Sequence, residues 1–281
     1  MAHSIKRRKR VQLLFIYIGL AAGLVYAAFP IFWMITMSIR SNLEIFTVPP
    51  RIVPKHFTVE AYRAILTNPT RIRFFINSYV VVISVTILTL LVSILGAYSF
   101  SRFTFRGKKL IHIFIISTQT VPPITLLIPF FGLIVALRMY DTYFALILTY
   151  MAFTLPYAIL MMTGYFNTIP KELDEAVLVD GASRFFALWK VLVPVSVPGI
   201  VATAIFTFLL GWNEFLFALT LTKTTEMRTV PIGIQQMMGQ FSYQWNEMMA
   251  MSLLGSLPVL LIYLFAQKYF LAGMTAGSVK S

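Results

Sequence analysis

The chain has 281 residues, of which 58% are hydrophobic and only 12% are charged, and its mean hydropathy is +0.81. Soluble domains carry about 25% charged residues, so this composition excludes an ordinary soluble protein and indicates a polytopic membrane protein. The formal net charge of +13 fits contact with anionic membrane lipid. No nucleic-acid partner is expected, because no basic-aromatic domain is present. The sequence contains no cysteine, which excludes disulfides and thiolate metal sites.

Six segments are long and apolar enough to span a membrane, for which about 20 residues are needed. In chain order they are Val11 to Ile39, Phe74 to Ser101, Leu110 to Leu137, Thr142 to Pro170, Val191 to Thr222 and Met248 to Gln267. Each is predicted to be a helix, since lipid cannot hydrogen-bond a bare backbone, and the fold is therefore all-α.

The first segment follows a basic run, Lys6 to Arg10, as a secretory signal peptide would. Its apolar region of 29 residues is longer than the roughly 7 to 15 of a cleaved signal. We therefore predict a retained helix. Residues 1–73 form an N-terminal tail, this helix and an extracytoplasmic loop, residues 74–270 form a five-helix core, and residues 271–281 form a C-terminal tail.

Two prolines interrupt the third segment. Pro122 and Pro123 have no N–H group, so the carbonyls of Thr118 and Gln119 lose their helix partners. Freed carbonyls at this depth are tolerated where neighbours or a cavity satisfy them. The pair is either a structural kink or part of a substrate pathway or gate.

A charged stretch separates the fourth and fifth segments. Glu172, Asp174 and Glu175 suit the positive end of a helix dipole, so a short helix is predicted to start near Lys171. Gly181 suits a left-handed helix end, and Asp180 is the expected N-cap of a second short helix. Residues with apolar side chains in this pair indicate contact with a partner and with the bundle; they are Leu173, Val177, Phe185, Leu188 and Trp189. An amphipathic helix lying on lipid headgroups is the alternative.

Glu214 is the one formal charge inside the six segments. An acidic residue in a span usually faces protein or water. With Trp212 and Asn213 it either lines a substrate route, where the aromatic face suits a sugar, or fixes helix packing.

Lysine and arginine counts orient the chain. With a cytoplasmic N-terminus, 14 of the 23 basic residues lie on the inner side; they are Lys6, Arg7, Arg8, Lys9, Arg10, Arg102, Arg106, Lys108, Lys109, Lys171, Arg184, Lys190, Lys268 and Lys280. Six spans then place both termini and the stretch from Lys171 to Lys190 in the cytoplasm.

The spacing in this stretch resembles a known pattern. Glu175-Ala176-Val177, three residues, Gly181, nine residues and then Val191-x-Val193-Pro194 is similar to the coupling loop of binding-protein-dependent ABC importer permeases. Their pattern is Glu-Ala-Ala, three residues, Gly, nine residues, Ile-x-Leu-Pro. Val177, Val191 and Val193 depart from it but keep the surface apolar.

Further pieces resemble the maltose-type carbohydrate importers. They are Phe75 to Ser78, Ala97 to Phe103, Pro122-Pro123, Trp212 to Phe215, Arg228 to Pro231 and Tyr269 to Lys280. The resemblance implies a type I ABC importer permease in a prokaryotic inner membrane. It also implies a second permease subunit, two ATPase subunits and an extracytoplasmic solute-binding protein as partners.

The resemblance assigns roles to individual residues. The residues expected to couple to the ATPase are Glu175, Ala176, Val177, Asp180, Gly181, Val191 and Pro194. Those that we place on a substrate pathway are Gln119, Pro122, Pro123, Trp212, Asn213 and Glu214.

The chain is not expected to be an enzyme. It has no G-x-x-x-x-G-K-[ST] loop for ATP phosphates, so ATP and Mg should bind to partner ATPase subunits and no cofactor to this chain. Its three scattered histidines offer no metal site. The predicted function is inward transport of a sugar or sugar-like solute by alternating access. A stand-alone secondary transporter or channel, which would need its own ion-coupling residues, and a membrane scaffold are the alternatives.

Overall fold

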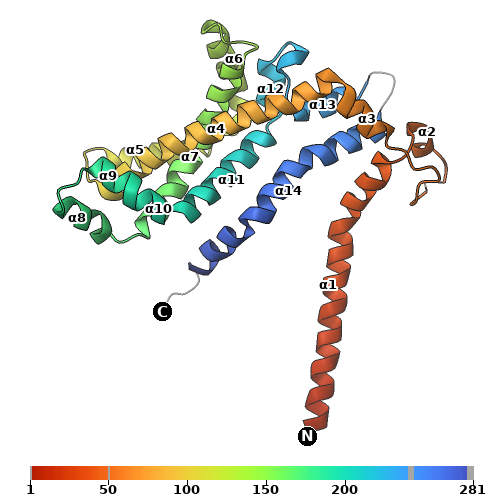
Figure 1. Ribbon diagram of the computed structural model, residues 1–281, viewed down its shortest axis with the longest axis horizontal. Coiled ribbons are helices and arrows are strands. Elements are labelled where there is room, and N and C mark those ends of the chain that lie inside the picture. Colours follow the sequence, from red (N-terminus) through yellow and green to blue (C-terminus); the bar gives the residue numbers. More distant parts are fainter. Residues whose placement is uncertain (1, 50, 240–243, 277–281) are drawn as a thin grey trace. The chain divides into compact units, whose positions relative to one another are not determined.

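The computed structural model describes residues 2–49, 51–239 and 244–276, and the described chain is built from helices, which confirms the all-α prediction there (Figure 1). The chain divides into two compact units. The first consists of Met1–Asn68 and Ile234–Gly255, and the second consists of Pro69–Gly233 and Ser256–Ser281. Residues 277–281 of the predicted C-terminal tail, including Lys280, lie outside the described residues.

The helical elements follow one another without a separate soluble domain in the described chain. In chain order they are α1 (Ala2–Ser38), α2 (Asn42–Ile45), α3 (Glu60–Thr67), α4 (Pro69–Arg102), α5 (Lys108–Thr118), η1 (Pro123–Leu126), α6 (Leu127–Ala136), α7 (Tyr143–Asn167), α8 (Glu172–Val179), α9 (Arg184–Ala187), the π-helix η2 (Leu188–Leu192), α10 (Val193–Val195), α11 (Val197–Trp212), α12 (Leu216–Leu221), η3 (Thr225–Met227), α13 (Val230–Gln236) and α14 (Trp245–Ala276).

The first unit is organised by a buried arginine just after α1. Arg40 is 2% exposed, and its Nη1 and Nη2 donate to the carbonyls of Arg51 and Ile52 at 3.0 and 3.1 Å. Its Nε donates to the carbonyl of Thr36 at 2.9 Å. These bonds satisfy backbone oxygens that a proline-rich loop leaves without helix partners, so the loop folds back on the end of α1.

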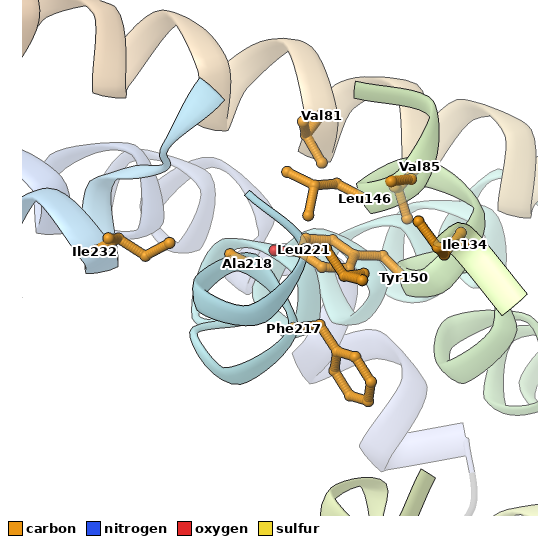
Figure 2. Close-up of a cluster of buried hydrophobic side chains, with 10 residues drawn as sticks. Val81, Val85, Ile134, Leu146, Tyr150, Phe217, Ala218, Leu221 and Ile232 are labelled. Carbon is orange, nitrogen blue, oxygen red and sulfur yellow. The ribbon is translucent and has the colours of Figure 1, made fainter. Parts of the chain in front are cut away.

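The second unit is built around α4, which packs along α7 and α11. One core cluster joins α4 and α7 to α6, α12 and α13. Figure 2 shows Val81 and Val85 reaching from α4 toward Leu146 and Tyr150 of α7. Phe217 of α12 joins the same cluster. Thr142 caps the start of α7 by accepting the N–H of Ala145 at 3.3 Å, as expected of an N-cap threonine.

Four helices in the described chain are long and apolar enough to cross a membrane; they are Gln12–Ser38 within α1, α4, α7 and Trp245–Phe265 within α14. Two bent helix pairs bring the number to six if each pair is one span. The six-span prediction therefore holds in this form. The expectation that every span is one helix is wrong for the third and the fifth.

The third span breaks at the two prolines. Helix α5 ends at Thr118, and the pair of Lys108–Thr118 and Pro123–Ala136 is bent by 98°. Pro122 lies in an extended conformation, with φ −59° and ψ 130°. A proline pair cannot continue the hydrogen-bond ladder, and the residue before a proline avoids helical angles. The chain therefore turns where the sequence predicted a kink.

The fifth span breaks twice. The helical segment Arg184–Val195 meets α11 at an angle of 79°, with Ser196 at the corner. Pro198, in the first turn of α11, has no N–H to continue the preceding helix. At its far end α11 stops at Trp212, and α12 begins at Leu216. Length and hydrophobicity predicted one helix, because both breaks lie inside a segment that is apolar apart from a few residues.

Candidate functional site

The charged stretch after α7 folds as a pair of short helical segments. Helix α8 has Lys171 as its N-cap and Glu172, Asp174 and Glu175 in its first turn, where their charge favours the helix dipole. It ends before Gly181, whose φ is +82°. This is the left-handed conformation that the sequence predicted for a glycine at a helix end.

The cap of the second helix differs from the prediction. Asp180 is the C-cap of α8, and its backbone N–H donates to the carbonyl of Ala176 at 3.2 Å. Ser183 caps α9 instead, since its Oγ accepts the N–H of Phe186 at 3.2 Å. Two residues separate Gly181 from α9, which moves the cap position past Asp180.

One face of this pair packs on the bundle. Leu188 and Leu192 of η2 are each 1% exposed and belong to a cluster with Ile94, Met162 and Phe166. Figure 1 shows α8, α9 and α10 grouped near one end of α4. The π-helix changes the register of the helix that carries these leucines.

The other face carries large apolar side chains that the chain itself does not cover. Leu173 is 42% exposed, Val179 87% and Phe185 66%. Apolar groups gathered on a charged surface segment mark an interaction surface. The predicted bundle-facing side is present in the structure, and the partner-facing side stays a prediction.

The residues predicted to couple to an ATPase divide between these environments. Val177 and Val191 are half-buried, whereas the others are exposed; these are Glu175, Ala176, Asp180, Gly181 and Pro194.

Sequence reasoning missed the ion pair that attaches α8 to the bundle. Arg102, the last residue of α4, donates from Nε to Asp174 Oδ2, and the two side chains are 6% and 8% exposed. The segment from Ala97 to Phe103 carried part of the family resemblance and was the available signal. It gave no indication of the partner, which lies 72 positions away.

A cavity of about 550 Å³ lies between the end of α5, η1, α7, α11 and the start of α12. It brings together Gln119, Pro123 and Glu214 from the predicted pathway set. Aromatic and hydroxyl side chains share its wall; they are Thr118, Phe130, Tyr150, Phe153, Thr154, Tyr157, Phe206 and Phe217. A mixed wall of this kind can hold a polar solute that also has apolar faces.

The other three pathway residues do not line this cavity. Trp212 is 5% exposed and stacks on Phe208 at 5.4 Å between ring centroids. Asn213 is exposed and donates to the carbonyl of Leu209 at 2.9 Å. Pro122 is the N-cap residue of η1.

Glu214 has a structural task beside its place at the cavity. Its Oε1 accepts the N–H of Phe217 at 2.8 Å, and its Oε2 accepts the N–H of Ala218 at 3.0 Å. Both donors lie in the first turn of α12, where N–H groups have no helix partners. The carboxylate therefore caps α12 while lining the cavity, and its place on a substrate route stays a prediction.

At its N-terminal end α4 holds a loop distant in sequence. Asn77 Nδ2 donates to the carbonyls of Glu226 and Arg228, both at 2.7 Å, and Asn77 Oδ1 accepts from the Tyr143 hydroxyl at 2.7 Å. Ser78 Oγ accepts the N–H of Val230 at 2.9 Å. Two sequence pieces that carried the resemblance, Phe75 to Ser78 and Arg228 to Pro231, thus meet in space.

Asp141 makes a second link at this end. Its Oδ1 accepts the N–H groups of Lys223 at 2.8 Å and Thr224 at 3.1 Å. Burial raises the pKa of its carboxyl, but the hydrogen bonds from Lys223 and Thr224 and the Lys223 charge outweigh burial and leave the pKa below its usual value. The loop before α7 is thereby fastened to the loop after α12.

Comparisons with known proteins define the class to which this broken-helix bundle belongs. Residues 89–275 match the model of the binding-protein-dependent transport system inner membrane components. The chain belongs to this family and is a multi-pass permease subunit of an ABC importer, which works with a solute-binding protein and an ATPase.

Curated relatives match over nearly their whole length. The inner membrane ABC transporter permease protein YcjP of Escherichia coli (strain K12) is 35% identical over 267 residues, covering 94% of this chain and 95% of YcjP. The trehalose/maltose transport system permease protein MalG of Thermococcus litoralis is 35% identical over 277 residues, covering 98% and 99%.

Solved structures share the fold. A bacterial ABC transporter involved in the import of the acidic polysaccharide alginate contains a chain that matches with a TM-score of 0.82 and 22% identity, over 94% of this chain and 98% of that one. A chain of the MetNI methionine ABC transporter matches with a TM-score of 0.55 and 22% identity, over 76% and 98%.

Proposed function

We propose that this permease moves a sugar or sugar-like solute inward by alternating access. The observation that carries the proposal is the likeness to the trehalose/maltose permease MalG over 98% of the chain. The cavity beside Glu214 supports it, because aromatic faces and hydroxyl groups together suit a polyhydroxylated solute. Gln119 adds a buried amide nitrogen, Nε2, that has no hydrogen-bond partner among the described residues.

The segment 171–194 is the proposed contact with the ATPase. Its exposed apolar face is suited to a protein partner, and its buried face connects any displacement to α4 and α7. Both termini and this segment then lie in the cytoplasm of a prokaryotic cell. The absence of native cysteine allows a direct test of sidedness. A Glu172→Cys variant should react with a membrane-impermeant thiol reagent in inside-out vesicles and not in intact cells.

ATP and Mg bind to two partner ATPase subunits in this scheme, and this chain binds neither. We propose that a second permease subunit, a different polypeptide from this one, completes the passage. The purified chain alone should then show no ATP binding. The complete assembly should hydrolyse ATP faster when the solute-loaded binding protein is added.

Two variants test the coupling role. Glu175→Lys reverses a charge on the exposed part of α8, and Gly181→Val forces a β-branched residue into a left-handed conformation. We expect normal membrane insertion, weaker copurification of the ATPase and loss of ATP-driven uptake in both. Glu60→Lys, an exposed charge reversal in α3, is the matched control and should transport normally.

Uptake of a labelled disaccharide by the reconstituted assembly tests the transport reaction. Normal uptake by both variants would count against the coupling proposal. Uptake by the isolated chain under an ion gradient, without ATP, would favour the secondary transporter. A binding protein that copurifies with an amino acid or peptide instead of a carbohydrate would contradict the proposed solute class.

A further inference from the structure

One arginine side chain joins three helices at the base of the coupling segment. Besides its pairing with Asp174, Arg102 donates from Nη1 to the carbonyl of Phe166 at 2.9 Å and from Nη2 to the carbonyl of Ile169 at 3.1 Å. Its Nη1 also donates to Ser101 Oγ at 3.0 Å. The end of α4, the end of α7 and the first turn of α8 are therefore fixed to one guanidinium group.

This task requires the shape of an arginine. The guanidinium presents five N–H donors in a rigid planar fork, whereas lysine presents one rotatable ammonium and glutamine two donors. The carbonyls of Phe166 and Ile169 lie in and just past the last turn of α7, where helix carbonyls lose their ordinary helix partners. The carbonyl of Phe166 also accepts a hydrogen bond from the N–H of Ile169 at 3.2 Å. Arg102 satisfies them and holds Asp174 at the same time.

The pair is not explained by stability. A buried ion pair adds little net stability compared with apolar side chains of similar volume, because both charges must lose their water. Asp174 Oδ1 is buried and has no hydrogen-bond partner among the described residues, so the pairing is incompletely satisfied. What the pair does supply is a directional bond that fixes where α8 begins relative to α4.

The second half of the coupling segment is attached differently. Leu188 and Leu192 hold it through apolar packing, which has no preferred direction. The Tyr98 hydroxyl adds a long hydrogen bond of 3.4 Å to the carbonyl of Arg184. The strongest directional connection in the described segment is therefore the one between α8 and Arg102.

We propose that Arg102 is the positioning residue that locks α8 to the ends of α4 and α7, so that these three elements move as one body when the ATPase moves the coupling segment. Helix α4 packs along α7 and α11, so a displacement received at α8 reaches the walls of the cavity. The inference rests on the proposed function, in which the ATPase docks on segment 171–194.

Distance measurements on the complete transporter test whether α8 and α4 move as one body, and they leave Arg102 and Asp174 unchanged. Spin labels go on Glu172→Cys in α8 and Leu95→Cys in α4, both exposed positions in a chain with no native cysteine. The distance between the labels should be the same in the nucleotide-free and ATP-bound states, with ATP hydrolysis verified in the same sample. A change in this distance between the two states would overturn the proposal.

A variant then tests the consequence. In Arg102→Gln we expect the ATPase to copurify and hydrolyse ATP, because the exposed apolar face is unchanged. Solute moved per ATP should fall about tenfold, within the roughly 5- to 150-fold range of typical coupling effects. Arg106→Gln, an exposed arginine at the same end, is the matched control and should keep the wild-type ratio.

The outcomes separate the two proposals. A wild-type ratio of solute to ATP in Arg102→Gln would refute the role of Arg102. If Arg102→Gln does not assemble with the ATPase, the proposal is decided by the distance between the two spin labels, which is measured in a chain that keeps both Arg102 and Asp174. If Glu175→Lys binds the ATPase normally, docking on this segment fails. If docking holds and the label distance changes, only the locking role fails.

Discussion

The two ends of α4 each hold a segment that is distant in sequence, but they use different chemistry. At the N-terminal end, Asn77 and Ser78 bind backbone groups of residues 226–230 through neutral hydrogen bonds. At the C-terminal end, Arg102 binds Asp174 through a buried ion pair. The same helix thus fastens a loop at one end and a helix with an exposed apolar face at the other.

The difference indicates what each end has to do. Neutral amide and hydroxyl groups satisfy the carbonyls of a loop with little cost of burial. An ion pair costs more to bury but sets position and direction more strictly. The strict attachment occurs beside the surface that we assign to the ATPase, where force must be passed on. The neutral attachment occurs where the loop need only stay closed.

Removal of the acidic partner at the C-terminal end should have the largest effect. Asp174→Ala leaves the Arg102 charge buried without its counter-ion, for which a cost of about 3 to 5 kcal/mol is typical. We expect a large fall in the apparent melting temperature of the purified permease. Glu172→Ala, an exposed acidic residue in the same turn, should change it little. Equal melting temperatures for the two variants would show that the pair carries no such energy.

The neutral end should be less sensitive. Asn77→Ala removes two donated bonds and one accepted bond, and it leaves the carbonyls of Glu226 and Arg228 and the Tyr143 hydroxyl without that partner. The expected cost is about 1 to 3 kcal/mol. Ile76→Ala, at an exposed neighbouring position, is the control for thermal unfolding. If Asn77→Ala lowered the stability of the protein more than Asp174→Ala does, the ranking of the two ends of α4 would be reversed.

Asp141 offers a further test of the comparison between the two ends of α4, because the contribution of its carboxyl to stability depends on pH. The pKa of the Asp141 carboxyl in the folded chain lies below the ordinary value of 3.8. The ionised carboxylate therefore stabilises the fold at pH values above 3.8, and this contribution is lost as the pH falls from 3.8 toward the folded pKa. Asp141→Asn tolerates the same positive φ of 60° and should cost about 1 kcal/mol at pH 7, because the site is partly exposed. The wild-type chain should lose this advantage below about pH 4. If the difference in stability between the wild-type chain and Asp141→Asn were the same at low pH as at pH 7, the stabilising role of the ionised Asp141 carboxylate would be contradicted.

The smallest effect is expected at the start of α9. Ser183→Ala removes the cap of the Phe186 N–H, for which about 0.5 kcal/mol is expected at an exposed site. Hydrogen exchange of the α9 amides should become faster, while melting of the whole protein stays nearly unchanged. Unaltered exchange at Phe186 would show that Asp180 or water replaces the cap.

Local features were predictable because they depend on residues close in sequence. The apolar runs gave the spans, and the acidic first turn gave the start of α8 next to Lys171. The left-handed Gly181 also followed from the sequence. The cap of α9 did not, because Asp180 and Ser183 are both good cap residues and only the path of the chain between them selects one.

The cavity was predictable only in part. Gln119, Pro123 and Glu214 meet there, as a shared substrate route would require. Trp212 does not, because α11 ends at this residue with its ring stacked on Phe208 on another side of the helix. Sequence proximity to Glu214 suggested a common role, but Glu214 lies in the break between α11 and α12, so no regular helix relates the directions of the two side chains.

The sequence by itself determined a membrane-embedded all-α permease, its apolar spans and the helical pair between the fourth and fifth of them. These features follow from hydrophobicity, prolines and glycines acting over a few residues. Only the tertiary structure decided that Arg102 meets Asp174 and that Asn77 meets residues 226 and 228. Such contacts join positions about 70 to 150 apart, and they depend on how whole helices pack, which no local pattern encodes.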